Sequence, residues 1–319
     1  MSATPNRAQG APAGKPDSLR STPADAIWSA LPERDRQLLL WLLSGDIVTA
    51  QLAALLSYGH LRTAQRRLAR LAELGILRGF WAAGMHRPRG RHAYVLTRQA
   101  RLDVERLAWP AGRPDRARDM PPSTAVHQLA THDLFAAFLQ AGDPSRGEGI
   151  FAWIPERACG QLFDGFLRPD ALAGIRVGDR SIGLFIERDL GTERGEVLAD
   201  KIRRYRSTFA RARDLPVNVG FVVESERRAR TIHGLANGPE QVDGGPLFLT
   251  AVDARVHADP LGVTWSDDRM RWSTRELAST ADGVSLPILP PGCLAELDAI
   301  DALDAGALVM FPSLLAYLA

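Results

Sequence analysis

The chain has 319 residues, which is more than one ordinary hydrophobic core organises, so two domains with flanking segments are expected. Its 45% hydrophobic and 24% charged residues are typical of a globular protein and exclude a fibrous or wholly disordered chain. It has no apolar run of the roughly 20 residues that span a membrane, and its two cysteines lie far apart without neighbouring metal-ligand residues, so we expect a cytoplasmic protein without membrane contact.

The net charge of +2 conceals two halves of opposite sign. Residues 1–120 carry 19 Lys and Arg against 10 Asp and Glu, a balance of +9, and the remaining residues have a balance of −7. Between residues 61 and 101 there are ten Arg and one acid, Glu73. This concentration of positive charge predicts that the N-terminal half meets a polyanion, for which double-stranded DNA is the leading candidate.

Residues 1–24 are polar and rich in Pro, Ala and Gly, which predicts a disordered leader without a signal peptide. Residues 25–108 form the first predicted domain, in which helical periodicity is followed by strand periodicity. The expected elements are helices at 32–43, 49–56 and 61–74 and a hairpin of strands at 76–81 and 92–96, joined by a loop at 84–91.

A helix that follows a tight turn and precedes a basic hairpin resembles the winged helix-turn-helix of DNA-binding regulators, over residues 30–105. The resemblance implies that one exposed helix face and the wing contact the duplex. Its base edges or phosphates would be contacted by His60, Arg62, Gln65, Arg66 and Arg70. The adjacent backbone or minor groove would be reached by Arg87, Arg89 and Arg91. A solvated arginine-rich surface and a protein-docking module are the competing interpretations.

Residues 109–123 contain four prolines among charges and are predicted to be a linker. The second predicted domain spans 124–275 and has the order αβββαβ, which indicates an α/β layered architecture within a chain that is α+β overall. Its expected elements are a helix at 124–140, strands at 151–157, 166–176 and 181–189, a helix at 193–213 and a strand at 217–224. The apolar C-terminal extension, 276–319, is expected to pack back on this domain or to make a homodimer contact.

The pair Gly178-Asp179 predicts a two-residue hairpin turn, so residues whose numbers sum to 357 are expected to face each other across the strands. Asp170 and Glu187 satisfy that sum, which would bring their Cβ atoms within about 5 Å. Asp189 lies two residues further along and adds a third carboxylate to the same face.

Three carboxylates on one patch need positive charge beside them. One solution is a Mg²⁺ or Mn²⁺ ion held by Asp170, Glu187 and Asp189. The other is a set of structural salt bridges from the nearby cations, Arg168, Arg188 and Lys201.

These residues resemble the motifs of the PD-(D/E)xK nucleases, whose fold is that of restriction endonucleases. Pro169-Asp170 matches the first motif, Glu187-x-Asp189 the second, and Lys201-x-x-x-Tyr205 the helical motif of the subgroup related to the RecB nuclease. The resemblance implies metal held by the two acids and water activated for phosphodiester cleavage. Asp189 occupies the position of the usual lysine, and Lys201 is expected to supply that charge from the helix. Asp133 is a further candidate catalytic acid.

The whole arrangement resembles the replication-relaxation family of bacterial plasmids and conjugative elements, over residues 30–265. The residues that match its motifs are His127, His132, Asp133, Pro169, Asp170, Glu187, Asp189, Gly191, Thr192, Glu193, Lys201 and Tyr205. His127 and His132 are five residues apart, which does not favour a shared metal.

The resemblance to the replication-relaxation family implies a role in replication initiation or DNA processing, together with replication or transfer proteins of the element. Three functions stay open: a DNA-binding accessory factor with an altered nuclease-like domain, an active metal-dependent endonuclease or nickase, and a transcriptional regulator.

Overall fold

The computed structural model describes residues 24–84, 87–108, 122–163, 165–178, 180–211, 217–237, 247–267 and 269–279. The predicted leader, linker and C-terminal extension lie almost wholly outside these residues. Within the described part, no helix combines the length and the apolar character that crossing a membrane requires.

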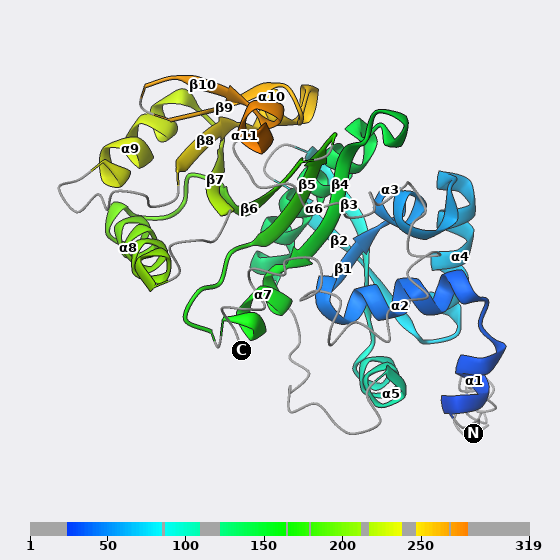
Figure 1. Cartoon of the computed structure of the whole chain (residues 1–319). Coiled ribbons are helices and arrows are strands. Elements are labelled where there is room, and N and C mark those ends of the chain that lie inside the picture. Colours follow the sequence, from blue (N-terminus) through cyan, green and yellow to red (C-terminus); the bar gives the residue numbers. More distant parts are fainter. Residues whose placement is uncertain are drawn as a thin grey trace, which may run out of the picture.

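The N-terminal part consists of helices around a small sheet (Figure 1). Its elements are α1 (Ala24–Ala30), α2 (Glu33–Gly45), β1 (Ile47–Thr49), α3 (Ala50–Ala53), η2 (Ala54–Tyr58), α4 (Leu61–Glu73), β2 (Leu77–Gly84), β3 (Arg87–Leu96) and α5 (Arg98–Ala108). The three strands form an antiparallel sheet in the order β1-β3-β2. Thr49 caps α3 by accepting a hydrogen bond from the backbone N–H of Leu52, and Gly59, at φ 74°, provides the left-handed turn that separates η2 from α4.

A buried cluster fixes α4 against α2. The carboxylate of Asp35, which is 1% exposed, accepts hydrogen bonds from the hydroxyl of Tyr58 at 2.8 Å and from Nε of Arg67 at 3.1 Å. Arg67 therefore faces this cluster, whereas Arg66 and Arg70 on the same helix are exposed. The cluster sets the orientation in which α4 presents its outer surface.

The larger part is built on a sheet of seven strands in the order β10-β9-β8-β7-β6-β5-β4. Its elements are α6 (Pro122–Ala141), η3 (Pro144–Arg146), β4 (Glu148–Pro155), α7 (Glu156–Leu162), β5 (Ala171–Val177), β6 (Arg180–Asp189), α8 (Gly195–Arg211), β7 (Val217–Val223), α9 (Glu226–Ala236), β8 (Phe248–Val252), α10 (Asp253–Ala258), β9 (Val263–Ser266), β10 (Arg271–Ser273) and α11 (Thr274–Ser279). Strand β6 pairs antiparallel with β5 and parallel with β7.

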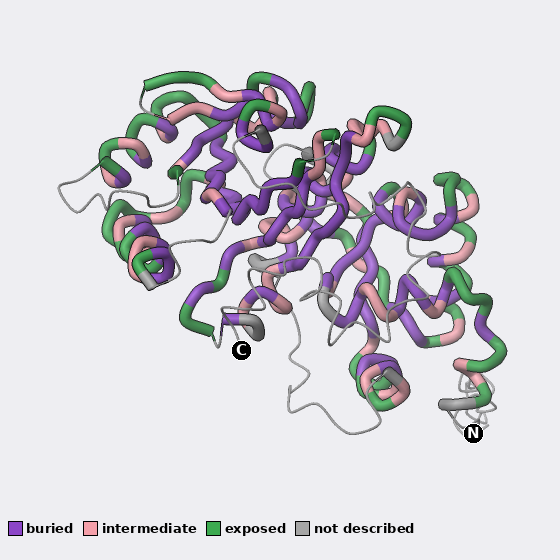
Figure 2. The backbone as a smooth tube through the Cα atoms, viewed as in Figure 1, coloured by how far each residue is buried: buried purple, intermediate pink, exposed green. Residues whose placement is uncertain are grey.

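Helices cover both faces of this sheet, which makes three layers. Apolar residues of α7, α8 and α9 pack on one face in a cluster that includes Phe185, Phe221 and Tyr205. Residues of α6, α10 and α11 pack on the other face in the cluster that contains Ile186 and Trp265. Figure 2 shows the central strands buried along most of their length, while the helices keep exposed outer faces. The mixed α/β class predicted from the sequence is confirmed.

The two parts are not separate bodies, because α6 lies between the two sheets. Ala125 and Leu129 of α6 pack on one face of the β2–β3 hairpin, and the core cluster that contains Phe135 and Phe138 extends into the N-terminal helices. Asp46 at the end of α2 pairs with Arg157 of α7 at 3.0 Å.

Several elements differ from the predicted ones. Strand β5 begins at Ala171 rather than near 166, and α7 stands where the chain was expected to continue without a helix. The hairpin strands β2 and β3 extend to Gly84 and from Arg87, so the loop between them is shorter than the predicted 84–91. The short strand β1 and the elements after β7 were not predicted. Apart from α9, which has 11 residues, these elements have three to six residues and are too short to show a period.

Candidate functional site

Strand β6 positions the charged groups of the candidate site. Alternation along the strand directs Phe185, Glu187 and Asp189 toward α8 and α9, and it directs Ile186 and Arg188 toward the opposite face. The predicted register is confirmed, since Ala171 pairs with Ile186 and Val177 pairs with Arg180, both on the sum of 357. Continuing that register one step places Asp170 level with Glu187.

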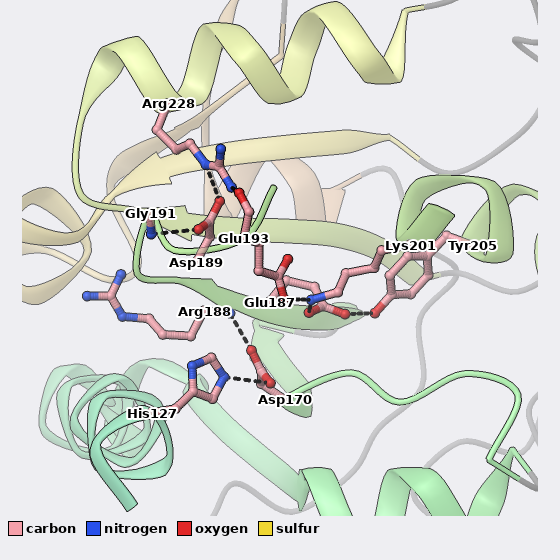
Figure 3. Close-up of polar contacts among 10 residues, drawn as sticks. All are labelled: His127, Asp170, Glu187, Arg188, Asp189, Gly191, Glu193, Lys201, Tyr205 and Arg228. Carbon is pink, nitrogen blue, oxygen red and sulfur yellow. Dashed lines mark hydrogen bonds and ion pairs between the residues drawn. The ribbon is translucent and has the colours of Figure 1, made fainter. Parts of the chain in front are cut away.

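Asp170 lies just before β5 and is held from two sides (Figure 3). Its Oδ2 accepts a hydrogen bond from the backbone N–H of Arg188 at 2.6 Å, and its Oδ1 is 2.8 Å from Nε2 of His127 on α6. Burial lowers the pKa of His127, but the hydrogen bond and charge of Asp170 outweigh burial, and the pKa lies above its usual value. His127 therefore orients Asp170 rather than joining His132.

Glu187 is the most buried acid of the group, at 2% exposure. Its Oε2 accepts a hydrogen bond from Nζ of Lys201 at 2.9 Å, and its Oε1 accepts one from the hydroxyl of Tyr205 at 2.5 Å. Burial and the charge of Asp170 raise the pKa of Glu187 to about 7, although Lys201 and Tyr205 oppose this rise. Burial alone would lower the pKa of Lys201, but the charges of Glu187 and Asp170 raise it above its usual value.

Asp189 is engaged by a different partner. Its Oδ2 lies 2.5 Å from Nε of Arg228 on α9, and its Oδ1 accepts a hydrogen bond from the backbone N–H of Gly191 at 2.7 Å. Gly191 adopts φ 74°, the left-handed conformation that this turn requires. Arg228 also donates to the backbone carbonyl of Glu193, whose side chain is 3.1 Å from Nζ of Lys201.

In this arrangement all three acids are engaged by groups of the chain itself. Arg228 and Lys201 already provide positive charge to Asp189 and Glu187. Across the residues that the structure describes, no three His, Cys, Asp or Glu side chains are grouped so that they could hold a metal ion. The observed contacts are those of the salt-bridged alternative, with Lys201 and Arg228 as the cations.

The other predicted cations have partners elsewhere. Arg168 pairs with Glu156 at 3.2 Å. The side chain of Arg188 points to the opposite face of the sheet, where it donates to the carbonyl of Val222 at 3.0 Å and pairs with Asp253 at 3.1 Å. Neither guanidinium neutralises the three acids, so Arg168 and Arg188 do not take the part that the salt-bridge alternative gave them.

Asp133 and Arg91 lie together at the junction of the two parts. Their side chains form an ion pair, and that of Arg91 is only 19% exposed. Asp133 is thus paired with the hairpin and is not part of the contacts of Asp170 and Glu187. Arg91 is directed toward α6 rather than outward. His132, one residue earlier, is buried against the ring of Trp41 with a centroid distance of 5.1 Å.

The outer face of α4 carries the predicted helix residues. All of them are exposed: His60, Arg62, Gln65, Arg66 and Arg70. Arg70 makes an exposed pair with Glu73 at 3.1 Å. The side chains of Arg87 and Arg89 lie outside the described residues, although their backbone belongs to β3. The helix therefore presents its arginines to solvent.

Arg228 was not predicted as a site residue from the sequence. It follows Ser225, which caps α9 by accepting a hydrogen bond from the backbone N–H of Arg228. The parallel register brings Asp189 level with Val223, so the residues after β7 return to the end of β6. A capping serine followed by an arginine does not by itself predict a site residue. Arg228 could be placed beside Asp189 only once the pairing of β6 with β7 was known.

Comparison with known families gives one match. The sequence model of a family described as replication-relaxation matches residues 46–223, which is more than half of the chain and includes both α4 and the acidic site. The searches of curated proteins and of solved structures give no match. The match confirms the resemblance that the motifs predicted, and the chain belongs to the replication-relaxation family.

Proposed function

We propose that the chain binds double-stranded DNA through a winged helix-turn-helix within residues 25–108 and acts in replication or DNA processing of a plasmid or other mobile element. The observation that carries this proposal is the exposed outer face of α4, on which Arg62, Gln65 and Arg66 lie side by side. Membership of the replication-relaxation family supports the same role. In this view the restriction-endonuclease-like domain is an accessory one that contacts DNA or replication and transfer proteins.

Replacing two of these arginines tests DNA binding. We expect Arg62→Ala/Arg66→Ala to weaken duplex binding at least about tenfold and to make log Kd less dependent on log salt, because two phosphate contacts are lost. Fluorescence anisotropy with a labelled duplex from about 50 to 200 mM salt measures both quantities. Arg227→Ala/Arg230→Ala, which removes two exposed arginines of α9, is the matched control. A wild-type affinity that is independent of salt would contradict the proposal.

A second candidate function is metal-dependent cleavage of DNA. The observation in its favour is that Asp170 stands level with Glu187, with Lys201 beside them. Against it, Lys201 and Arg228 already neutralise the acids. We therefore expect the wild-type chain to leave supercoiled and linear DNA uncut in Mg²⁺ or Mn²⁺. Gel electrophoresis decides: nicking that is lost in both Asp170→Asn and Glu187→Gln would make the chain a nuclease.

A further inference from the structure

Asp133 on α6 is an acid that the proposed function does not use. Its side chain forms an ion pair with Arg91 of β3, and the side chains of Arg91 and Asp133 are 19% and 39% exposed. The resemblance to a winged helix-turn-helix assigns Arg91 to DNA, whereas here its guanidinium is bound to a carboxylate from the larger part of the chain. The pair therefore occupies a cation that DNA binding would use.

The hairpin has no acid of its own that could neutralise Arg91. Residues 77–96 contain four Arg and no Asp or Glu. Ala82 stands directly across from Arg91 in the β2–β3 register, so the two side chains leave the hairpin on the same face. That face is covered by apolar residues of α6. The packing of α6 on the hairpin is therefore what brings the carboxylate of Asp133 to Arg91.

The ion pair is not what holds the hairpin on α6. Buried apolar side chains make that contact, including Ala93 of β3 and Ala125 and Leu129 of α6. An ion pair with one partner open to solvent contributes little to stability, because water screens it. Arg91 can therefore leave Asp133 for a phosphate while the packing between the hairpin and α6 stays in place.

We infer that the Arg91–Asp133 ion pair is an autoinhibitory contact, in which Asp133 holds Arg91 away from DNA. This inference rests on the proposed DNA-binding function and adds a regulation to it. The carboxylate occupies the guanidinium and also repels phosphates that approach the hairpin. Because α6 also carries His127, which lies 2.8 Å from Asp170, the same helix joins this contact to the acidic site. A change that separates the pair strengthens DNA binding.

Removing the charge of Asp133 tests the contact in the full chain. Asp133→Asn keeps the size of the side chain, and we expect it to lower Kd for a labelled duplex at least about threefold and to steepen the dependence of log Kd on log salt by about one phosphate contact. Fluorescence anisotropy measures both quantities. Asp133→Ser, a second way to remove the charge, should give the same gain. Asp200→Asn, which removes the charge of an exposed, paired acid on α8, is the matched control and should change Kd less than about twofold.

A double-mutant cycle shows whether the gain passes through Arg91. In the wild type, Arg91→Ala should change Kd less than about twofold, because Asp133 already occupies the guanidinium. In the Asp133→Asn background, the same substitution should cancel the whole gain. Thermal unfolding followed by circular dichroism checks that each variant is folded.

The outcomes separate this inference from the proposed function. If both substitutions of Asp133 leave Kd unchanged, or if the gain survives Arg91→Ala, the contact does not restrain Arg91 and the inference is wrong while DNA binding stands. If Arg91→Ala weakens the wild type as much as it weakens Asp133→Asn, Arg91 contacts DNA in spite of the pair, and the inference is again wrong. If neither the wild type nor Asp133→Asn binds duplex DNA, the proposed function fails and the inference falls with it.

Discussion

Replacement of Glu187 by alanine is expected to lower the free energy of unfolding by about 3 kcal/mol, the largest effect of any single substitution in the acidic site. The buried hydroxyl of Tyr205 would lose its acceptor, and Lys201 would keep only Glu193 as a partner. A buried charge or hydroxyl left without a partner costs more than the original pair contributed. Chemical denaturation at pH 7 measures the change.

Glutamine at position 187 should cost far less, about 1 kcal/mol. Burial already raises the pKa of Glu187 to about 7, so a neutral side chain resembles a state that the native protein populates near neutrality. The amide oxygen can still accept the hydrogen bond of Tyr205. Asp200→Ala, which removes an exposed partner of Arg203 on the same helix, is the control and should change stability by less than about 0.5 kcal/mol. Equal losses for Glu187→Ala and Glu187→Gln would contradict the buried-pair explanation.

The acidic site was predictable where local rules determine it. A two-residue turn with Gly178 at φ 65° sets the register of β5 and β6, and alternation along β6 then assigns Glu187 and Asp189 to one face. The helical spacing of Lys201 and Tyr205 likewise directs both toward that face. Each of these steps requires only neighbours within one hairpin or one helix.

Two of the partners that neutralise or orient the acids, Arg228 and His127, were not predicted, because they come from distant segments. Arg228 is 39 residues from Asp189, and the two meet only because β7 pairs parallel with β6. His127 meets Asp170 because α6 crosses beside the end of β5, a matter of layer packing that no periodicity encodes. The sequence therefore identified the acids and Lys201, but it did not identify Arg228 and His127 as the partners of Asp189 and Asp170.

The position of α6 between the two sheets was missed for the same reason. A helix was predicted at 124–140, and α6 spans that range. That Leu129 packs on the β2–β3 hairpin while Phe135 packs on the large sheet follows from tertiary structure alone. Consequently Arg91 and Asp133, assigned to DNA and to catalysis, form an ion pair at the junction.

Protonation of His132 at low pH should destabilise the protein more than protonation of a histidine with an ordinary pKa. Burial lowers the pKa of His132 to about 3, against an ordinary value of 6.5. As the pH falls, His132 is therefore protonated in the unfolded chain at a higher pH than in the folded protein. Stability from the neutral ring is fully present above pH 6.5 and is lost as the pH falls toward 3, by about 2 kcal/mol at pH 5 and about 4 kcal/mol at pH 3.5.

The comparison that isolates this effect is between the wild type and His132→Gln, which cannot take up a proton in this range. Because His132 contacts Trp41, the substitution removes some packing at every pH, so the informative quantity is the slope of stability against pH. We expect the free energy of unfolding of the variant to fall by about 2 kcal/mol less than that of the wild type between pH 7 and pH 5. His60→Gln, at an exposed histidine, should keep the wild-type slope. Parallel profiles of stability against pH for the wild type and His132→Gln would contradict this prediction. They would show that the ring is charged or reached by solvent in the folded protein, and that the junction between the two sheets is looser than its packing indicates.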